Sequence, residues 1–478
     1  MLKVSNAVKN EYFKNTTRYL NISISKSDTE VINISPYDIC QESMVLKERL
    51  LDKKSVEYVG CNASVFKITI NGLHKGLKGK KIEVSLHTEN TVGAPIPLFH
   101  GVVDDVKLQS NKKSIEITAY DMMYSLADED VTSWFRTQVA YLKMGKKLTI
   151  KKFRNDLFEF LGITQKKRTL ANDSFSIKQL VNMVDKDDEE DSDEEEQEKI
   201  YALDLIKAIC QINGVFGIIN RNGEMDYRRL GVEDEDDGAY PGVDPDDKTN
   251  GLYLPFVPGI GVTDIITDST FYPSYRSVTY EDYDVHGITK VYVRQSEDTK
   301  AGYSGSDKKY KYIVQGNRFT LGTTKEEKSN IATAILNKVQ GVTYTPFTAE
   351  CTGLPFLEVG DPVQFYVYDF EESDKQKKDV FVLKSFYVLS RTMKGIQSLT
   401  DTLTAQGEEK QRRFVSDLGV REDVSTASLK EKTDKQDERI KSLEDAAENG
   451  LKFVSVTALL DNPDPNTVYF IQGEVTVT

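Results

Sequence analysis

Two separated stretches of the chain alternate apolar and polar residues in the same order, and this shared pattern constrains the fold more than any other feature. The alternation has the period of two that is typical of half-buried β-strands. In the first stretch, strands are predicted at residues 79–86, 101–108 and 114–120, with a basic turn at 111–113 and Asp121 at the end. In the second stretch, they are predicted at residues 360–367, 380–388 and 395–400, with a basic turn at 391–394 and Asp401 at the end.

The matching order favours two copies of one small β-barrel in the same chain. The two stretches share few identical residues, so the alternative is that any two antiparallel meanders of this length look equally similar. A region of different character separates them. The fold class expected from the pattern is therefore α+β, mainly β.

Helical spacing replaces the strand pattern in the middle of the chain. Apolar residues three or four apart predict a helix through Phe153, Leu157, Phe160 and Leu161 that stops at Gly162. A second helix is predicted through Leu203, Ile206, Ile209 and Ile212, and it ends at Asn213 and Gly214.

Two further local signals follow along the chain. Residues 220–223 are predicted to form the turn of a hairpin between strands at 215–219 and 225–228. Thr324 and Glu327 form a capping-box pattern, which starts a helix through Ile331, Ile335 and Val339 that is stopped by Gly341.

Two acidic inserts hold the negative charge of the chain. The formal net charge is −14 over 478 residues, but residues 185–198 carry a net −10 and residues 233–247 a net −8, which leaves +4 for the rest. The first insert has no apolar residue and is predicted to be a disordered loop. Basic residues at 146–154 and 166–168 are expected to balance this charge and not to bind nucleic acid, since no helix-turn-helix or zinc module organises them.

No residues have the spacing of a catalytic or metal-binding motif. The histidines do not form an HExxH pair and the cysteines form no CxxC pair, so the cysteines are expected to be buried in a protein that folds in a reducing cytoplasm. The loop at 76–81 departs from the Walker A pattern, and residues 233–244 depart from a calcium loop. We also expect no signal peptide and no transmembrane segment. The four histidines are His74, His87, His100 and His286, and the four cysteines are Cys40, Cys61, Cys210 and Cys351.

A heptad-like rhythm near the C-terminal end predicts a short coiled coil. Leu429, Thr433, Gln436, Ile440, Leu443 and Ala447 alternate spacings of four and three. Within it, Arg439, Ile440, Leu443 and Glu444 match a trimerisation pattern, in which the arginine covers the core and pairs with the glutamate of the next helix. The alternative is an ordinary solvated helix with this spacing by chance.

Short motifs spread in order over residues 1–407 resemble the tail hub proteins of phages and prophages of low-GC Gram-positive bacteria. These hubs form the N-terminal part of what are called tail-associated lysin proteins. The resemblance lies in SPYDI at 35–39, GCNASVF at 60–66, ITAYDMMY at 117–124, INGVFG at 212–217, YTPF at 344–347, GLPFLEVGD at 353–361 and DTLTAQG at 401–407.

The resemblance implies a trimer with two tube-type β-barrels per chain, which adapts a six-fold tail tube to a three-fold tip and closes or lines the DNA channel. The implied partners are a distal tail protein ring, the tail tube or tape measure protein, and a receptor-binding protein. DNA would pass without specific recognition. The implied location is the tail tip of the virion, after assembly in the host cytoplasm.

Many relatives carry a hydrolase after the hub, but no hydrolase motif occurs in this sequence, so we expect no enzymatic activity, no cofactor and no metal. The alternative is a host cell-wall-degrading or host-adhesion tail protein. The acidic loops would be either solvated fringes or a negative lining that keeps DNA from sticking. The expected parts are a first β-barrel region at 1–130, an α+β middle region at 131–265, a second β-barrel region at 266–407, a linker and trimeric coiled coil at 408–449, and a small β tip at 450–478.

Overall fold

The structure is a computed structural model that describes residues 2, 4–12, 14–27, 29–51, 59–180, 199–230, 253–254, 275–306, 309–378, 380–408, 413–420, 452–456 and 467–471. The chain divides into two compact units, residues 1–420 and 421–478. The acidic inserts at 185–198 and 233–247, with the predicted disordered loop, lie outside the described residues, as does the predicted coil at 429–447.

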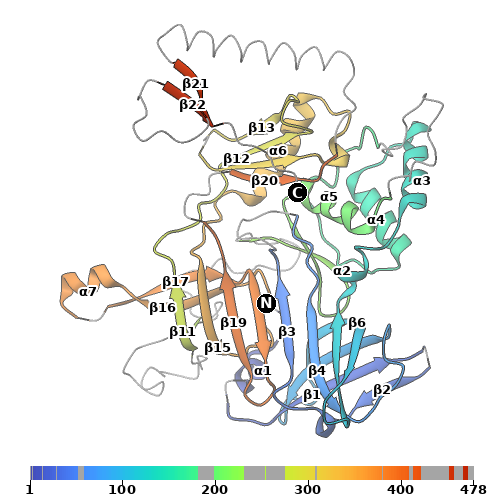
Figure 1. Cartoon of the computed structure of the whole chain (residues 1–478), viewed down its shortest axis with the longest axis vertical. Helices are drawn as coiled ribbons and strands as arrows, with labels where there is room; N and C mark the ends of the chain where they lie inside the picture. Colours follow the sequence, from blue (N-terminus) through green and yellow to red (C-terminus); the bar gives the residue numbers. More distant parts are fainter. Residues whose placement is uncertain are drawn as a thin grey trace. The chain divides into compact units, whose positions relative to one another are not determined.

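Strands from both predicted β regions belong to one large antiparallel sheet, which Figure 1 shows with its strands side by side. The strands predicted at 360–367 and 380–388 belong to a separate three-stranded sheet. The prediction of a mainly β protein with some helix is therefore confirmed, although no closed barrel is present among the described strands. From edge to edge the order is β11 (Tyr275–Tyr280), β15 (Phe347–Thr352), β19 (Thr400–Ala405), β18 (Ser390–Lys394), β3 (Val45–Arg49), β4 (Val65–Asn71), β7 (Ser114–Tyr120), β6 (Ile96–Leu108), β5 (Lys81–Thr88), β1 (Arg18–Ser25) and β2 (Val31–Ile34).

The two β regions are built on the same pattern of strand pairing. β4 pairs with β7 as β15 pairs with β19. β5 pairs with β6 as β16 (Pro362–Tyr368) pairs with β17 (Phe381–Tyr387). The sequence-based expectation of two similar regions is thus matched by an equivalent order of strands.

Backbone hydrogen bonds fix which residues are equivalent. Gly79 N–H donates to Val103 O at 2.7 Å, and Gly360 N–H donates to Val388 O at 2.6 Å. Both glycines have positive φ, 77° and 91°, which a residue with a Cβ adopts only at a cost. Gly72 and Gly353 are equivalent in the same way. The N–H of Gly72 donates to Lys113 O, and the N–H of Gly353 donates to Leu399 O. Residues 65–88 therefore match residues 346–369 without a gap.

One long strand in the first region corresponds to two strands in the second. The first half of β6 pairs with β5 and its second half with β7, with a shift in register between Val103 and Asp105. In the second region, β17 pairs with β16 and β18 pairs with β19, and the chain changes partner at Val388 and Leu389. The break thus lies where the first region has its bulge.

One predicted strand and one predicted turn in the second region were wrong. Residues 391–394, predicted as a turn, belong to strand β18, and residues 395–399 form the turn that was predicted as strand. Strand β19 starts at Thr400, so Asp401 lies near the beginning of a strand, whereas Asp121 follows the end of β7. The two aspartates are therefore not equivalent.

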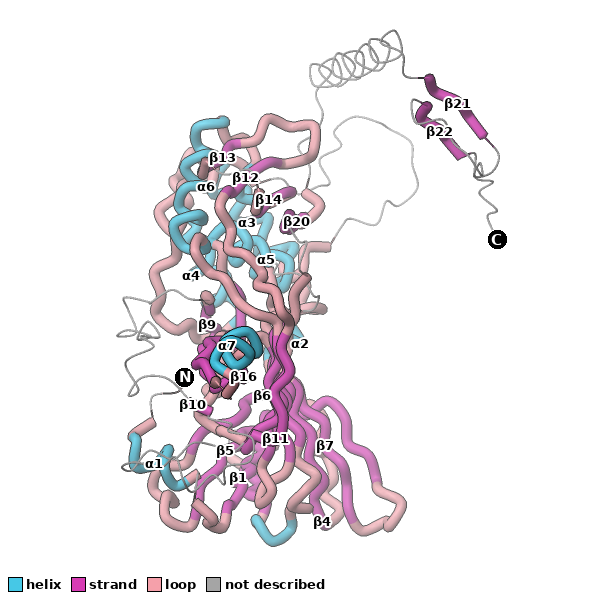
Figure 2. The backbone as a smooth tube through the Cα atoms, turned by 90° about the vertical axis from the view of Figure 1, so that its left-hand side faces the viewer, coloured by secondary structure: helices cyan, strands magenta, loops and turns pink. Residues whose placement is uncertain are grey.

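A second layer of helices and strands packs at one end of the large sheet (Figure 2). Its four-stranded sheet has the order β13 (Gly302–Ser304), β12 (Lys290–Arg294), β14 (Lys311–Gln315) and β20 (Arg413–Asp417). Its helices are α3 (Thr132–Lys143), α4 (Ile150–Leu161), α5 (Ala202–Asn213) and α6 (Lys325–Val339). Gln211 of α5 donates to Ser416 O at 2.7 Å, so the middle region and strand β20 share one core.

The predicted helix signals in this layer are confirmed. α4 and α5 end at Gly162 and Gly214, both in the left-handed conformation, and α6 begins with a complete capping box between Thr324 and Glu327. One residue differs from expectation, because Phe160 is 53% exposed although its spacing placed it on the apolar face of α4. Its ring stacks on Trp134 of α3 with centroids 5.9 Å apart.

Shorter elements complete the first unit. The predicted hairpin is confirmed as β8 (Phe216–Ile219) and β9 (Met225–Arg228). A three-stranded sheet joins β10 (Tyr253–Leu254) to β16 and β17, and α1 (Asn6–Glu11), α2 (Met122–Ser125) and α7 (Phe370–Gln376) are short helices. Among the described residues, no helix combines the length and apolarity needed to cross a bilayer.

The second unit is described over two strands only. β21 (Lys452–Val456) and β22 (Thr467–Ile471) pair in parallel. They lie in the segment where a small β tip was predicted.

Candidate functional site

The joint between the two β regions is the most distinctive place in the described structure. β18 of the second region pairs antiparallel with β3 of the first, with Met393 opposite Leu46 and Thr392 opposite Lys47. Both Met393 and Leu46 are fully buried. The joint therefore buries one face of each strand and makes a single sheet of the two regions.

A buried arginine holds this joint together. Arg391 of β18 has no exposed surface on its side chain, and its Nε and Nη2 donate to the two carboxylate oxygens of Asp401 at 2.9 and 2.7 Å. Its Nη1 lies 3.5 Å from Glu48 Oε2, across the joint on β3. Such bidentate charge-assisted bonds are the strong ones, and they satisfy charges that could not otherwise be buried.

A second arginine reaches the joint from the middle region. Arg221 lies in the turn of the β8–β9 hairpin, and its Nη2 donates to Glu48 Oε2 at 3.0 Å and to Leu357 O at 2.7 Å. Arg391 also donates to Leu357 O. Glu48 thus pairs with one guanidinium from each side, and the loop at residues 353–359 is tied to both.

The same loop carries a further buried ion pair. Arg228 Nη2 lies 2.8 Å from Glu358 Oε2, and both side chains are less than a tenth exposed. Burial by itself raises the pKa of Glu358, but the guanidinium groups of Arg228 and Arg221 outweigh it and hold that pKa well below its usual value. Glu358 is therefore ionised whenever the protein is folded at neutral pH.

The basic residues at 146–154 and 166–168 do not all act as predicted. Arg154 is buried and bonds both carboxylate oxygens of Asp173 at 2.9 and 2.8 Å. Arg168 is also buried, and its Nε donates to Asp226 Oδ1 at 2.8 Å. These two arginines therefore bind carboxylates of the folded core, and not the acidic insert.

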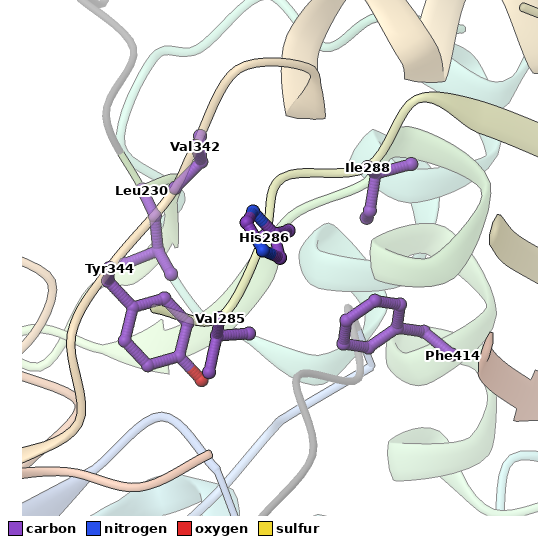
Figure 3. Close-up of a pocket in the computed structure, with 7 residues that line it drawn as sticks. All are labelled: Leu230, Val285, His286, Ile288, Val342, Tyr344 and Phe414. Atoms are coloured by element: carbon purple, nitrogen blue, oxygen red, sulfur yellow. The ribbon is translucent and has the colours of Figure 1, made fainter. Parts of the chain in front are cut away.

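A small pocket in the second layer offers no site for a substrate. It is lined by apolar side chains, with His286 at its centre in Figure 3. The hydroxyl of Tyr344 donates to Gln406 O at 2.7 Å, and the space accessible to the centre of a water molecule is about 10 Å³. That is room for about one water molecule. The lining residues are Leu230, Val285, His286, Ile288, Val342, Tyr344 and Phe414.

The histidines and cysteines lie apart from one another, with one exception. The Sγ atoms of Cys61 and Cys210 are 3.7 Å apart as buried free thiols, and burial raises the pKa of Cys210. Cys351 is also buried, as predicted, whereas Cys40 is half-buried. Over the described residues, no group of three or more histidine, cysteine, aspartate or glutamate side chains has the geometry to hold a metal ion.

The predicted trimerisation residues Arg439, Ile440, Leu443 and Glu444 lie outside the described residues, so their role stays a prediction. The residues of the joint were not predicted as a site. Arg391 is the sequence signal that could have indicated the joint. An arginine between two apolar strands is as consistent with a buried ion pair as with a basic turn.

Comparisons with known proteins give structural similarity alone. No family model matches the chain, and no curated protein matches it. It is similar to a tail protein from Neisseria meningitidis, with 11% identity, a TM-score of 0.41, and coverage of 83% of this chain and 99% of that one.

Two other solved structures are similar at the same level. The 43 kDa tail protein of prophage MuSo2 from Shewanella oneidensis has 11% identity, a TM-score of 0.43, and coverage of 81% of this chain and 98% of that one. The prophage tail protein gp18 from Listeria monocytogenes has 12% identity, a TM-score of 0.39, and coverage of 82% and 95%. At these TM-scores the similarity carries no argument about the role of this chain.

Proposed function

We propose that the protein is a structural, non-enzymatic component of a phage tail, a trimeric hub at the distal end of the tail tube. The observation that carries the proposal is the pair of equivalent β regions joined edge to edge in one sheet. Three such chains supply six equivalent regions, which is the number that a six-fold tube requires of a three-fold tip.

The ordered sequence motifs support the same function. They extend over residues 1–407, and several lie in structurally equivalent or joint-forming places. YTPF precedes and enters β15, GLPFLEVGD forms the loop that binds Arg221 and Arg391, and DTLTAQG begins in β19 with Asp401. Two of the motifs, GLPFLEVGD and DTLTAQG, therefore supply Leu357 and Asp401, which accept hydrogen bonds from the arginines of the joint.

In this role the six β regions form a closed ring around the DNA channel, and the predicted linker and coiled coil at residues 408–449 follow along the three-fold axis. The ring binds a distal tail protein ring and the tail tube or tape measure protein, and the tip at 450–478 faces a receptor-binding protein. DNA passes through the ring without sequence recognition. The protein is thus a part of the virion.

Mass and shape together test this function. Light scattering of the full chain is expected to give three times 54.0 kDa, and electron micrographs are expected to show rings. A single species of another mass without rings would contradict the hub. Zymography on Gram-positive cell walls tests the cell-wall-degrading alternative, and a cleared zone would favour that alternative over a purely structural role.

A further inference from the structure

We propose that neighbouring copies of the chain join through β11 of one copy and the second half of β6 of the next, in the register that β3 and β18 use within one chain. The inference rests on the proposed trimer and specifies the surfaces that make it. Each copy would then contribute a different edge to its two neighbours, as a head-to-tail ring requires.

The strand order provides the first argument. Strand β3 has β4 on one side and β18 on the other, and its equivalent β11 has β15 on one side. Strand β18 has β19 on one side and β3 on the other, and its equivalent, residues 105–108 of β6, has β7 on one side. Among the described residues, no strand pairs with the remaining edge of either β11 or this part of β6. Figure 1 shows β11 and β6 on opposite sides of the sheet.

The hydrogen-bond equivalences fix the register. Val103 matches Val388, so Leu108, five residues later, matches Met393. Residues 65–71 match 346–352, and Leu46 pairs with Phe66 as Tyr280 pairs with Phe347, so Tyr280 matches Leu46. Met393 lies opposite Leu46 in the internal joint. Leu108 of one copy is thus placed opposite Tyr280 of the next, and Lys107 is placed opposite Glu281.

Exposure of these residues provides an independent argument. Met393 and Leu46 are both fully buried, whereas Leu108 is 58% and Tyr280 38% exposed. The neighbouring loop differs in the same direction, because Leu354 is fully buried and its equivalent Leu73 is 57% exposed. Apolar side chains are therefore uncovered at the free edges in the places where the internal joint covers them.

Charge complementarity agrees with this register. Lys107 and Glu281 have opposite charges, both are exposed, and cross-strand pairs of opposite charge are favourable. In the internal joint, Gly395 N–H donates to Met44 O, so the pair of Thr392 and Lys47 is not hydrogen-bonded. The equivalent pair of Lys107 and Glu281 is also of that type, in which the two Cα atoms lie about 4.5 Å apart.

This geometry allows a cysteine cross-link between copies. The test variant is the full chain with Lys107→Cys and Glu281→Cys, and with Cys40→Ser to remove the half-buried thiol. The two new cysteines can form a disulfide because this bond accommodates a Cα separation of about 4.5–6.8 Å. Mild oxidation is expected to give covalent dimers and trimers on a non-reducing gel. The matched control replaces Glu281→Cys by Asp282→Cys, which lies beyond the end of β11 and outside the proposed register, and is expected to remain uncross-linked.

A second variant tests the apolar contact. Leu108→Asp is expected to raise the concentration at which half of the trimer dissociates by about tenfold or more. Met144→Asp is the control, because Met144 is 71% exposed at the end of α3 and away from both edges. Circular dichroism checks that both variants fold.

The outcomes separate this inference from the proposed function. Cross-linking at 107 and 281 but not at 107 and 282, with weakened association of Leu108→Asp, supports the joint. A trimer that neither cross-links nor responds to Leu108→Asp overturns the joint and leaves the hub in place. A chain that is monomeric at every concentration overturns both.

Discussion

Arg391 contacts carboxylates of both β regions at once. Its guanidinium is fully buried between Asp401 and Glu48, which come from strands on either side of it. Removing one partner of a buried ion pair leaves an uncompensated charge, and this costs far more than the pair is worth on a surface.

Arg391→Met is therefore expected to lower the free energy of unfolding by about 3–5 kcal/mol, measured by urea denaturation. The matched control is Lys152→Met, which removes the surface pair of Lys152 with Asp156 at 2.8 Å. That pair is partly exposed, and its loss is expected to cost at most about 0.5 kcal/mol. Equal losses in the two variants would contradict the role given to Arg391.

Asp121 provides a test by pH at the end of β7. Burial is the largest influence on this carboxyl group and raises its pKa from 3.8 to about 7, although the backbone N–H groups of Ser64 and Met123 donate to it. Between pH 3.8 and about pH 7, Asp121 is therefore protonated in the folded protein and ionised in the unfolded chain. Its stabilising effect is full below pH 3.8 and is lost as the pH rises through 7.

Asp121→Asn removes this titration. The difference in unfolding free energy, wild type minus variant, is therefore expected to fall as the pH rises from about 4 to 8. Urea denaturation at several pH values measures it. A difference that stays constant would show that the carboxyl group titrates near its ordinary pKa, and one that grows with pH would show that its pKa is lowered in the folded protein.

At the scale of single elements, helices α4 and α5 both end at a glycine C-cap, but the surroundings of the two glycines differ. Gly162 and Gly214 have φ values of 67° and 63°. A Cβ on Gly162 would meet nothing within 4 Å, whereas a Cβ on Gly214 would lie 3.0 Å from Ile335 and from Val339 of α6.

Gly162→Ala is accordingly expected to cost about 1 kcal/mol, from the left-handed conformation alone. Gly214→Ala is expected to cost more, because the packing of α5 on α6 must also give way. Thermal unfolding of the two variants measures the difference. A Gly214→Ala variant as stable as Gly162→Ala would mean that α6 shifts freely.

The helices could be predicted from sequence because their signals are local. Apolar spacing, a capping box and a terminal glycine act within a few residues, and α4, α5 and α6 have the predicted ends. Strand β18 could not be predicted in this way. Arg391 and Lys394 made it look like a turn, and Arg391 is buried only because Asp401, Glu48 and Leu357 surround it from distant parts of the chain.

The turn after β18 was missed for a related reason. Ile396 and Leu399 are buried and suggested a strand, but Gly395 has φ of 74° and the Gln397 side chain bonds the backbone of Arg18 in β1. A contact with a residue so far away in sequence is not visible in the local pattern. The joint as a candidate site was missed because it is made only by such contacts.

At the scale of the whole molecule, the predicted coil and the sheet edges would hold the trimer independently. Linking two contacts in one assembly makes the second one effectively intramolecular, so each raises the apparent strength of the other. Residues Ile440 and Leu443 are the proposed core of the coil, and the edges are β11 and β6.

Ile440→Asp with Leu443→Asp is expected to move trimer dissociation to higher protein concentration by tenfold or more, measured by light scattering over a dilution series. The cross-link between residues 107 and 281 is expected to persist in this variant at high concentration. An unchanged dissociation curve would show that the coil contributes nothing to assembly. The matched control is Lys441→Asp, since that residue lies outside the predicted seam.

The pairing of β3 with β18 also has a consequence for how the chain is made. β3 ends at Arg49 and its partner begins at Ser390, about 340 residues later. At about 5–20 residues per second, the ribosome needs roughly 20 to 70 seconds to supply that partner. Throughout this time β3 lacks the strand that covers it in the finished protein. Residues 105–108 of β6 in a completed copy nearby, which are equivalent to β18, pair with β7 on one side and with no described strand on the other. Chains made side by side on one messenger RNA are thus exposed to pairing of β3 with β6 of another copy, and slow, crowded synthesis favours this mispairing.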